Sequence, residues 1–182
     1  MNLAPLAERF GAERRARLTA PLVGLLEQLR ELISIMPNAM YIAQPAARVS
    51  GSIGEHVRHS LDHVSAFAAA LAGEELSYDH RLRGTTLEVD PRTAVNEIDR
   101  LFVRLERVPP TSLDRQVTLS SLVAVGRPPL TMRTTIAREL AFVVQHTIHH
   151  CALIAVLVEW QGGRVPHGFG VAPSTAAARA SA

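Results

Sequence analysis

The chain has 182 residues, 47% of them hydrophobic, which suits one domain with a substantial core. Its 19 basic and 17 acidic residues nearly balance, and no long basic tract is present, so we expect no nucleic-acid partner. The single cysteine excludes an intramolecular disulfide and any zinc motif built from cysteines. The N-terminus has no signal-peptide pattern, so we expect a cytoplasmic protein that does not enter a membrane.

Helical patterns dominate the first part of the chain. Aromatic residues make up only 4%, which favours packed helices over a sandwich or barrel. Leucines at spacings of three and four predict a helix over 18–36. Ser52 and Glu55 form a capping-box pattern, which predicts a second helix that begins there and ends near Gly73.

The middle of the chain contains a connecting segment followed by a third helix. Residues 77–91 show no sustained periodicity and are predicted to connect helices. Asp90 fits an N-cap and Pro91 fits the first helical position, so a third helix is expected from here to Pro109.

The last third contains extended segments followed by a long helix. Within 112–132, alternating and β-branched runs predict two short strands before Pro128. A fourth, largely apolar helix is predicted over 134–162. Residues from about 172 are rich in Ala, Ser and Pro and are expected to be mobile. The sequence therefore predicts an all-α four-helix bundle with short extended segments in the crossover before the last helix.

Six of the eight histidines lie in two short windows of the second and fourth predicted helices. Residues three or four apart share a helix face, so the first window forms one stripe, and an i, i+4 pair in the second window forms another. Such a pair can chelate one metal ion when a third ligand comes from elsewhere in the fold. The six residues are His56, His59, His63, His146, His149 and His150.

The third ligand stays open when only the residues are considered. A helical projection places His56 and His63 beside the apolar stripe and His59 further round, so amphipathicity favours His56 or His63. His149 lies about 100° from His150 around the helix and should not share the ion. We expect His149 to be a boundary or dimer-contact residue.

The two windows in this order, SIGEHVRHSLDH at 52–63 and HTIHH at 146–150, resemble the DinB/YfiT superfamily of metal-binding four-helix bundles. The resemblance covers about residues 18 to 162. It implies a divalent metal held by one histidine of the second helix and an HxxxH pair of the last helix. Two registers of the superfamily motif both select His59, so the implied ligands are His59, His146 and His150.

Further residues are candidates for supporting roles. Ligand imidazoles usually hydrogen-bond through their other nitrogen, and Glu139 lies on the same helix face as His146. His56 and His63 then support the ligands or line the pocket. Weaker candidates as hydrogen-bond partners are Glu55 and Asp62. Solvated helix carboxylates are the alternative for all three acidic residues, and Cys151 is expected to be a buried, unreactive thiol.

Two more stretches, YDHRLRGTTLE and FGVAPST, look similar to family segments. Tyr78, Arg81 and Arg83 of the first are substrate-binding candidates, because arginine can bind an anionic group. We expect the second, residues 169–175, to lie with the first near the mouth of the site. Ordinary loop and tail packing is the alternative.

Superfamily members include metal-dependent transferases that use low-molecular-weight thiols. The resemblance thus implies a metal-dependent enzyme that activates a low-molecular-weight thiol or water, with a thiol S-transferase as the leading expectation. The alternatives are a non-catalytic metal-binding stress or interaction protein and a metal-dependent hydrolase. Zinc or nickel is the expected ion, with iron and manganese as alternatives. The expected partners are a small-molecule substrate and a second copy of the chain.

Overall fold

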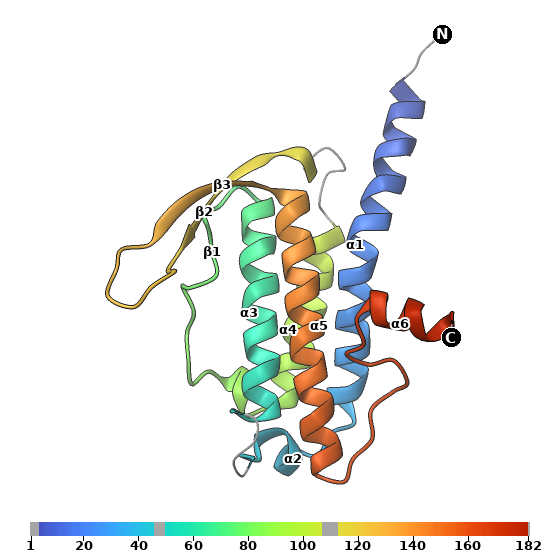
Figure 1. Ribbon diagram of the computed structural model, residues 1–182, viewed down its shortest axis with the longest axis vertical. Helices are drawn as coiled ribbons and strands as arrows, with labels where there is room; N and C mark the ends of the chain where they lie inside the picture. The colour runs from blue at the N-terminus through green and yellow to red at the C-terminus, as the bar shows by residue number, and fades with distance from the viewer. Residues whose placement is uncertain (1–3, 46–49, 107–112, 182) are drawn as a thin grey trace.

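The computed structural model describes residues 4–45, 50–106 and 113–181, with side chains described from residue 19 onward. The described residues contain four long helices, which run side by side in Figure 1 and confirm the predicted helical bundle. In chain order they are α1 (Ala4–Ser34), α3 (Ile53–Leu71), α4 (Pro91–Glu106) and α5 (Ile136–Trp160). The short helix α2 (Asn38–Ile42) connects α1 to α3.

The core lies between the four long helices, where α3 and α1 each pack against both α4 and α5. Each helix contributes aliphatic side chains that are almost fully buried, such as Leu26 of α1, Val64 of α3, Ile98 of α4 and Ile154 of α5. Among the described helices, α5 is the one that is long and apolar enough to cross a membrane, judged by length and composition. It packs against both α3 and α1 and supplies buried side chains to the core, and these contacts account for part of its apolar composition.

The predicted helix starts of α3 and α4 are confirmed. The Ser52 hydroxyl accepts a hydrogen bond from the Glu55 amide (3.1 Å), and the Glu55 carboxylate accepts one from the Ser52 amide (2.6 Å). This capping box satisfies two amides that a helix start leaves without partners. The Asp90 carboxylate accepts from the Thr93 amide (3.2 Å) at the start of α4.

The first helix is longer than its leucine pattern predicts, beginning at Ala4 rather than near residue 18. In Figure 1 the N-terminal part of α1 extends past the ends of the other helices. Leucine periodicity marks only the part of a helix that packs against a partner, so it locates the bundled part of α1 and not its start.

The prediction of two strands before Pro128 is wrong for the second strand. The strands are β2 (Gln116–Ser121) and β3 (Leu130–Thr135), an antiparallel pair joined by residues 122–129, in which the Arg127 amide donates to the Ala124 carbonyl oxygen (3.3 Å) across the turn. The β-branched run 122–125 forms the hairpin tip, where Val125 is fully exposed and Gly126 has a φ of 73°. A left-handed glycine and two prolines favour a turn more strongly than β-branching favours a strand.

The connection between α3 and α4 contributes β1 (Leu76–Ser77), which pairs in parallel with β2, and the short helix η1 (Thr86–Glu88). The resulting three-stranded sheet lies at one end of α3 and α5 in Figure 1. Residues 77–85 leave this sheet and run along α3, so they are positioned beside any site on that helix.

Candidate metal centre

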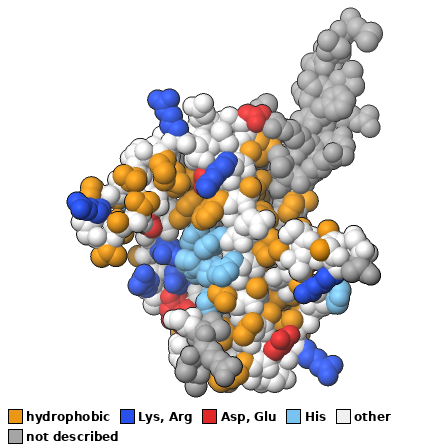
Figure 2. All heavy atoms as spheres, viewed as in Figure 1, with side chains coloured by type: hydrophobic (Ala, Val, Ile, Leu, Met, Phe, Trp, Pro, Cys, Tyr) orange, Lys and Arg blue, Asp and Glu red, His pale blue; other side chains and the backbone are white. Residues whose placement is uncertain are grey.

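Three histidines from two helices converge on one point. His59 of α3 and His146 and His150 of α5 each offer a ring nitrogen, and these nitrogens all lie within 4.8 Å of one another. The ring centroids form a nearly equilateral triangle, with sides of 4.9 Å, 4.5 Å and 4.6 Å. In Figure 2 the histidine side chains gather into one patch on the face formed by α3 and α5, so part of the cluster reaches the surface.

The donor set fits a divalent transition metal. Nε2 of His146 is buried and has no hydrogen-bond partner in the described part of the chain, which is unfavourable unless a ligand meets it. Burial, followed by neighbouring cationic charge, lowers the pKa of His59 to about 2, of His146 to about 4 and of His150 to about 3. All three imidazoles are therefore neutral near pH 7, which is the form that binds metals.

His56 supports His150 from the adjacent turn of α3. The two Nδ1 atoms lie 3.0 Å apart, so one ring donates a hydrogen bond and the other accepts it. When His150 donates, its Nε2 lone pair is left for an ion, which is the arrangement that usually orients a ligating imidazole. His56 therefore occupies the supporting position that the sequence analysis suggested for it.

His63 is held in a stack between an imidazole and a phenol. Its ring lies 3.9 Å from His146 and 5.0 Å from Tyr78, centroid to centroid, and is nearly parallel to the Tyr78 ring. Its Nδ1 lies 3.0 Å from the His59 carbonyl oxygen. Because a carbonyl only accepts, Nδ1 carries the proton, and His63 belongs to the wall of the site rather than to the convergent trio.

Glu139 supports this wall instead of a ligand. Its fully buried carboxylate accepts hydrogen bonds from the Tyr78 hydroxyl (2.9 Å), the Thr134 hydroxyl (2.7 Å) and Arg138 (2.7 Å). Glu139 thus accepts from the Tyr78 hydroxyl and not, as expected, from a ligand imidazole. Burial also raises the pKa of Tyr78, so the phenol keeps the proton that it donates. Tyr78 therefore positions His63, and its donor is not free for a substrate.

The two arginines that the sequence predicts as substrate-binding candidates differ in position. Arg81 is half-buried, and its Nη1 contacts Nδ1 of His59 and lies 3.3 Å from Nε2 of the same ring. Arg83 is exposed and makes no described contact with the histidines. The structure thus brings Arg81, and not Arg83, to the point of convergence.

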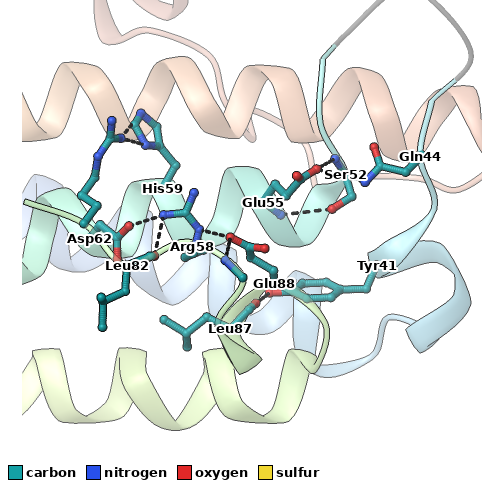
Figure 3. Close-up of polar contacts among 12 residues, drawn as sticks. Tyr41, Gln44, Ser52, Glu55, Arg58, His59, Asp62, Leu82, Leu87 and Glu88 are labelled. Atoms are coloured by element: carbon teal, nitrogen blue, oxygen red, sulfur yellow. Dashed lines mark hydrogen bonds and ion pairs between the residues drawn. The ribbon is translucent and has the colours of Figure 1, made fainter. Parts of the chain in front are cut away.

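A buried arginine that the sequence analysis did not single out fixes this loop (Figure 3). Arg58 of α3 forms ion pairs with Asp62 and with Glu88 (2.5 Å), and its guanidinium reaches the Leu82 carbonyl oxygen (3.4 Å). Glu88 in turn accepts from the Gly84 amide (3.1 Å). The i, i+4 spacing of Arg58 and Asp62 was an available signal, but only the fold shows that both side chains face the loop. Of the two weaker carboxylate candidates, Asp62 therefore pairs with Arg58, and Glu55 caps the start of α3.

The remaining two candidates on α5 lie away from the centre. His149 is exposed and is not among the convergent ligands, as expected; its role in a dimer stays a prediction. Cys151 is buried, and burial raises the pKa of its thiol to about 12. An un-ionised, inaccessible thiol is unreactive, as expected.

The C-terminal segment packs on the other side of α5, not at the mouth of the site. Gly170 lies against the backbone of Ala152, where an added Cβ would be 2.6 Å from the amide nitrogen. Ala152 follows His150 by two residues and so faces away from α3. Residues 173–180 form α6, which Figure 1 places beside α1; the mobility expected from residue 172 onward stays a prediction. The packing of the C-terminal segment on α5 depends on Gly170, because only glycine can approach the backbone of Ala152 this closely.

Comparisons with known proteins agree with this arrangement. Among solved structures, the chain is similar to the DinB-like protein YjoA of Bacillus subtilis, with a TM-score of 0.59 and 23% identity over 84% of this chain and 97% of that one. A stretch of 101 residues is 34% identical to FK506-binding protein 5 of Rhizopus delemar, covering 55% of this chain and 26% of that protein. The chain thus spans about a quarter of that relative's length. The sequence model of the DinB family matches residues 23–177, from α1 to α6, and the chain therefore belongs to the DinB family.

Proposed function

We propose that this protein binds one divalent metal ion through His59, His146 and His150 and uses it to activate a low-molecular-weight thiol or water. The observation that carries the proposal is the convergence of three neutral imidazoles, whose ligand nitrogens all lie within 4.8 Å of one another. Three histidine ligands with a further position open to solvent are typical of catalytic rather than structural metal sites. When bound, the ion would lower the pKa of a coordinated thiol or water.

The protein's own residues would orient the ligands and shape the pocket. His56 would hold the ring of His150 through the Nδ1 contact. His63, fixed by the His59 carbonyl and stacked on Tyr78, would form the wall beside His146. These groups would keep the ligand rings in place before the ion arrives, which lowers the conformational cost of binding.

The finer assignments belong to the same proposal. Zinc or nickel is the ion we favour, since imidazole suits both, and iron or manganese is the alternative. The activity we favour is thiol S-transfer to a small electrophile in the cytoplasm, by a homodimer that has neither a nucleic-acid nor a membrane partner. A non-catalytic metal-binding protein and a metal-dependent hydrolase are the competing functions, and the experiments below distinguish them.

Metal analysis of untagged protein tests the first step. We expect about one ion per chain after loading and dialysis, because the three ligands lie in one preformed cluster. Less than about 0.2 ion per chain, with no uptake on titration, would contradict the proposal.

Turnover assays test the second step. Metal-loaded protein is incubated with bacillithiol, mycothiol or glutathione and an electrophile such as monochlorobimane, and the metal-free protein serves as the control. Metal-dependent conjugation with one of these thiols supports S-transfer. A loaded protein that turns over none of them but hydrolyses an activated ester or amide supports the hydrolase, and one that does neither supports a binding function.

A further inference from the structure

Arg81 is a cation at the centre without a described anionic partner. Its Nη1 contacts the neutral ring of His59, and no carboxylate of the described residues lies within ion-pair distance of its guanidinium. The nearby carboxylate of Asp62 is paired with Arg58, and that of Glu139 with Arg138. A half-buried guanidinium normally acquires a carboxylate or phosphate partner, because its charge is otherwise poorly compensated.

The loop that carries Arg81 is held in place on both sides of it. On one side, the Asp79 carboxylate accepts a hydrogen bond from the Leu122 amide of the β2–β3 hairpin (2.6 Å). On the other side, Arg58 reaches the Leu82 carbonyl oxygen and Glu88 binds the Gly84 amide. The position of Arg81 is therefore built into the fold, and a binding site prepared in this way loses little entropy when it binds a ligand.

The charges around the centre favour an anionic ligand. The carboxylates of Asp62 and Glu139 are paired with other arginines of the protein, so the guanidinium of Arg81 faces the centre without a described anion to balance it. A guanidinium presents several donors in a planar fork that matches a carboxylate. Because Nη1 lies 3.3 Å from Nε2 of His59, a group bound to Arg81 would lie next to the metal ligands.

We propose that Arg81 is the receptor for an anionic terminal group of the substrate, so that the site takes small thiols that carry a carboxylate in preference to neutral thiols. This inference rests on the proposed function, since it requires the thiol to reach the centre. It assigns the chemical class of the substrate, and it selects Arg81 over the exposed Arg83 as the residue that recognises it.

The test uses the cobalt-loaded full chain, in which thiolate binding is followed by visible absorption. Affinities are measured for β-mercaptopropionate, for its alcohol analogue mercaptopropanol, and for mercaptoethanesulfonate. We expect the wild-type protein to prefer the carboxylate over the alcohol by about tenfold or more, as a charge-assisted hydrogen-bonded pair provides. Arg81→Gln should reduce this preference to within about twofold, and Arg83→Gln should retain it. Tight binding of the sulfonate as well would show that the receptor accepts anions of either shape.

The outcomes separate this inference from the proposed function. No cobalt uptake by the wild-type protein would overturn both. Cobalt uptake with equal affinities for the acid and the alcohol, or with no thiol binding, would overturn the inference alone. A preference that persists in Arg81→Gln would show that the carboxylate chelates cobalt without Arg81, which also overturns it. Loss of cobalt uptake in Arg81→Gln would assign Arg81 to the support of His59 instead, and would contradict the proposed role.

Discussion

Two buried polar clusters flank α3, and they differ in how fully their groups are partnered. The histidine cluster (His56, His59, His63, His146 and His150) faces α5. The Arg58 network (Arg58, Asp62 and Glu88) faces the loop on another side of the helix, and Figure 3 shows Arg58 and His59 pointing in different directions. The Arg58 network pairs its charges within the protein, and Nε of Arg58, which has no hydrogen-bond partner among the described residues, still forms an ion pair with Glu88 (2.5 Å). In the histidine cluster, the buried Nε2 atoms of His56 and His146 have no hydrogen-bond partner among the described residues.

This difference distinguishes a structural network from a binding site. Folding tolerates buried polar groups when they satisfy one another, so the Arg58 network can be explained by stability and loop position. The packed imidazoles satisfy one another only in part, because the buried Nε2 atoms of His56 and His146 have no hydrogen-bond partner among the described residues. Their arrangement is understandable when an external group completes it, which is why the histidine cluster and not the Arg58 network is assigned to function.

Lowering the pH should produce the largest difference between the two clusters, measured as a loss of stability. The cluster histidines have folded-state pKa values below the ordinary 6.5, mainly because of burial. The unfolded chain therefore takes up protons first, and the metal-free protein should lose stability as the pH falls from about 6.5 toward 4. Urea unfolding at several pH values measures this loss.

His150→Gln should reduce that pH dependence, and the same substitution at the exposed His149 should leave it nearly unchanged. An equally steep acid transition in His150→Gln would show that other groups, such as surface carboxylates, control the effect.

Metal affinity should depend on three members of the histidine cluster. Replacing His59, His146 or His150 by alanine should weaken zinc binding by more than about 100-fold, since even loss of a supporting partner typically costs ten- to 100-fold. Competition with a chromophoric chelator measures the change, with His149→Ala as the matched control. Full retention in His59→Ala, with loss in His56→Ala or His63→Ala, would move the third ligand to a neighbouring turn.

Stability should depend on the Arg58 network instead. Arg58→Ala leaves Asp62 and Glu88 without their cation, and we expect a loss of about 3 kcal/mol in the free energy of unfolding. The exposed Arg83→Ala, from the loop that this network holds, should change stability by less than about 0.5 kcal/mol. His59→Ala should behave like Arg83→Ala in the metal-free protein; a large loss there would erase the distinction between the clusters.

The smallest effect is expected at the wall of the site. Tyr78→Phe removes one hydrogen bond to Glu139 but keeps the ring that stacks on His63. We expect a loss of about 1 kcal/mol in stability and little change in metal affinity. A drop in affinity comparable to that of the ligand variants would mean that the Tyr78 hydroxyl, and not the stack, positions the site.

Much of this arrangement could be predicted from local sequence patterns. The capping residues Ser52 and Asp90 and the leucine spacing identify the bundle because helix ends and apolar faces are local properties. The spacing of His146 and His150 likewise identifies a chelating pair. His59 needed the family resemblance: the helical projection correctly placed His56 and His63 against the core, but a ligand must reach an opening as well as a buried face.

Other features depended on contacts between distant segments. Nothing local shows that Arg58 would meet Glu88, or that Gly170 would bring the C-terminal segment against α5 rather than to the mouth of the site. The second strand was misplaced because the apolar run before Pro128 follows strand propensity, whereas the turn that exposes it is set by Gly126 and the two prolines.

A crystal structure of the zinc-loaded protein, with anomalous diffraction measured at the zinc edge, tests the central claim most directly. The account predicts one anomalous peak per chain, about 2.0–2.1 Å from a ring nitrogen of each of His59, His146 and His150. A peak bonded to His56 or His63 in place of His59, or no peak between α3 and α5, would contradict it.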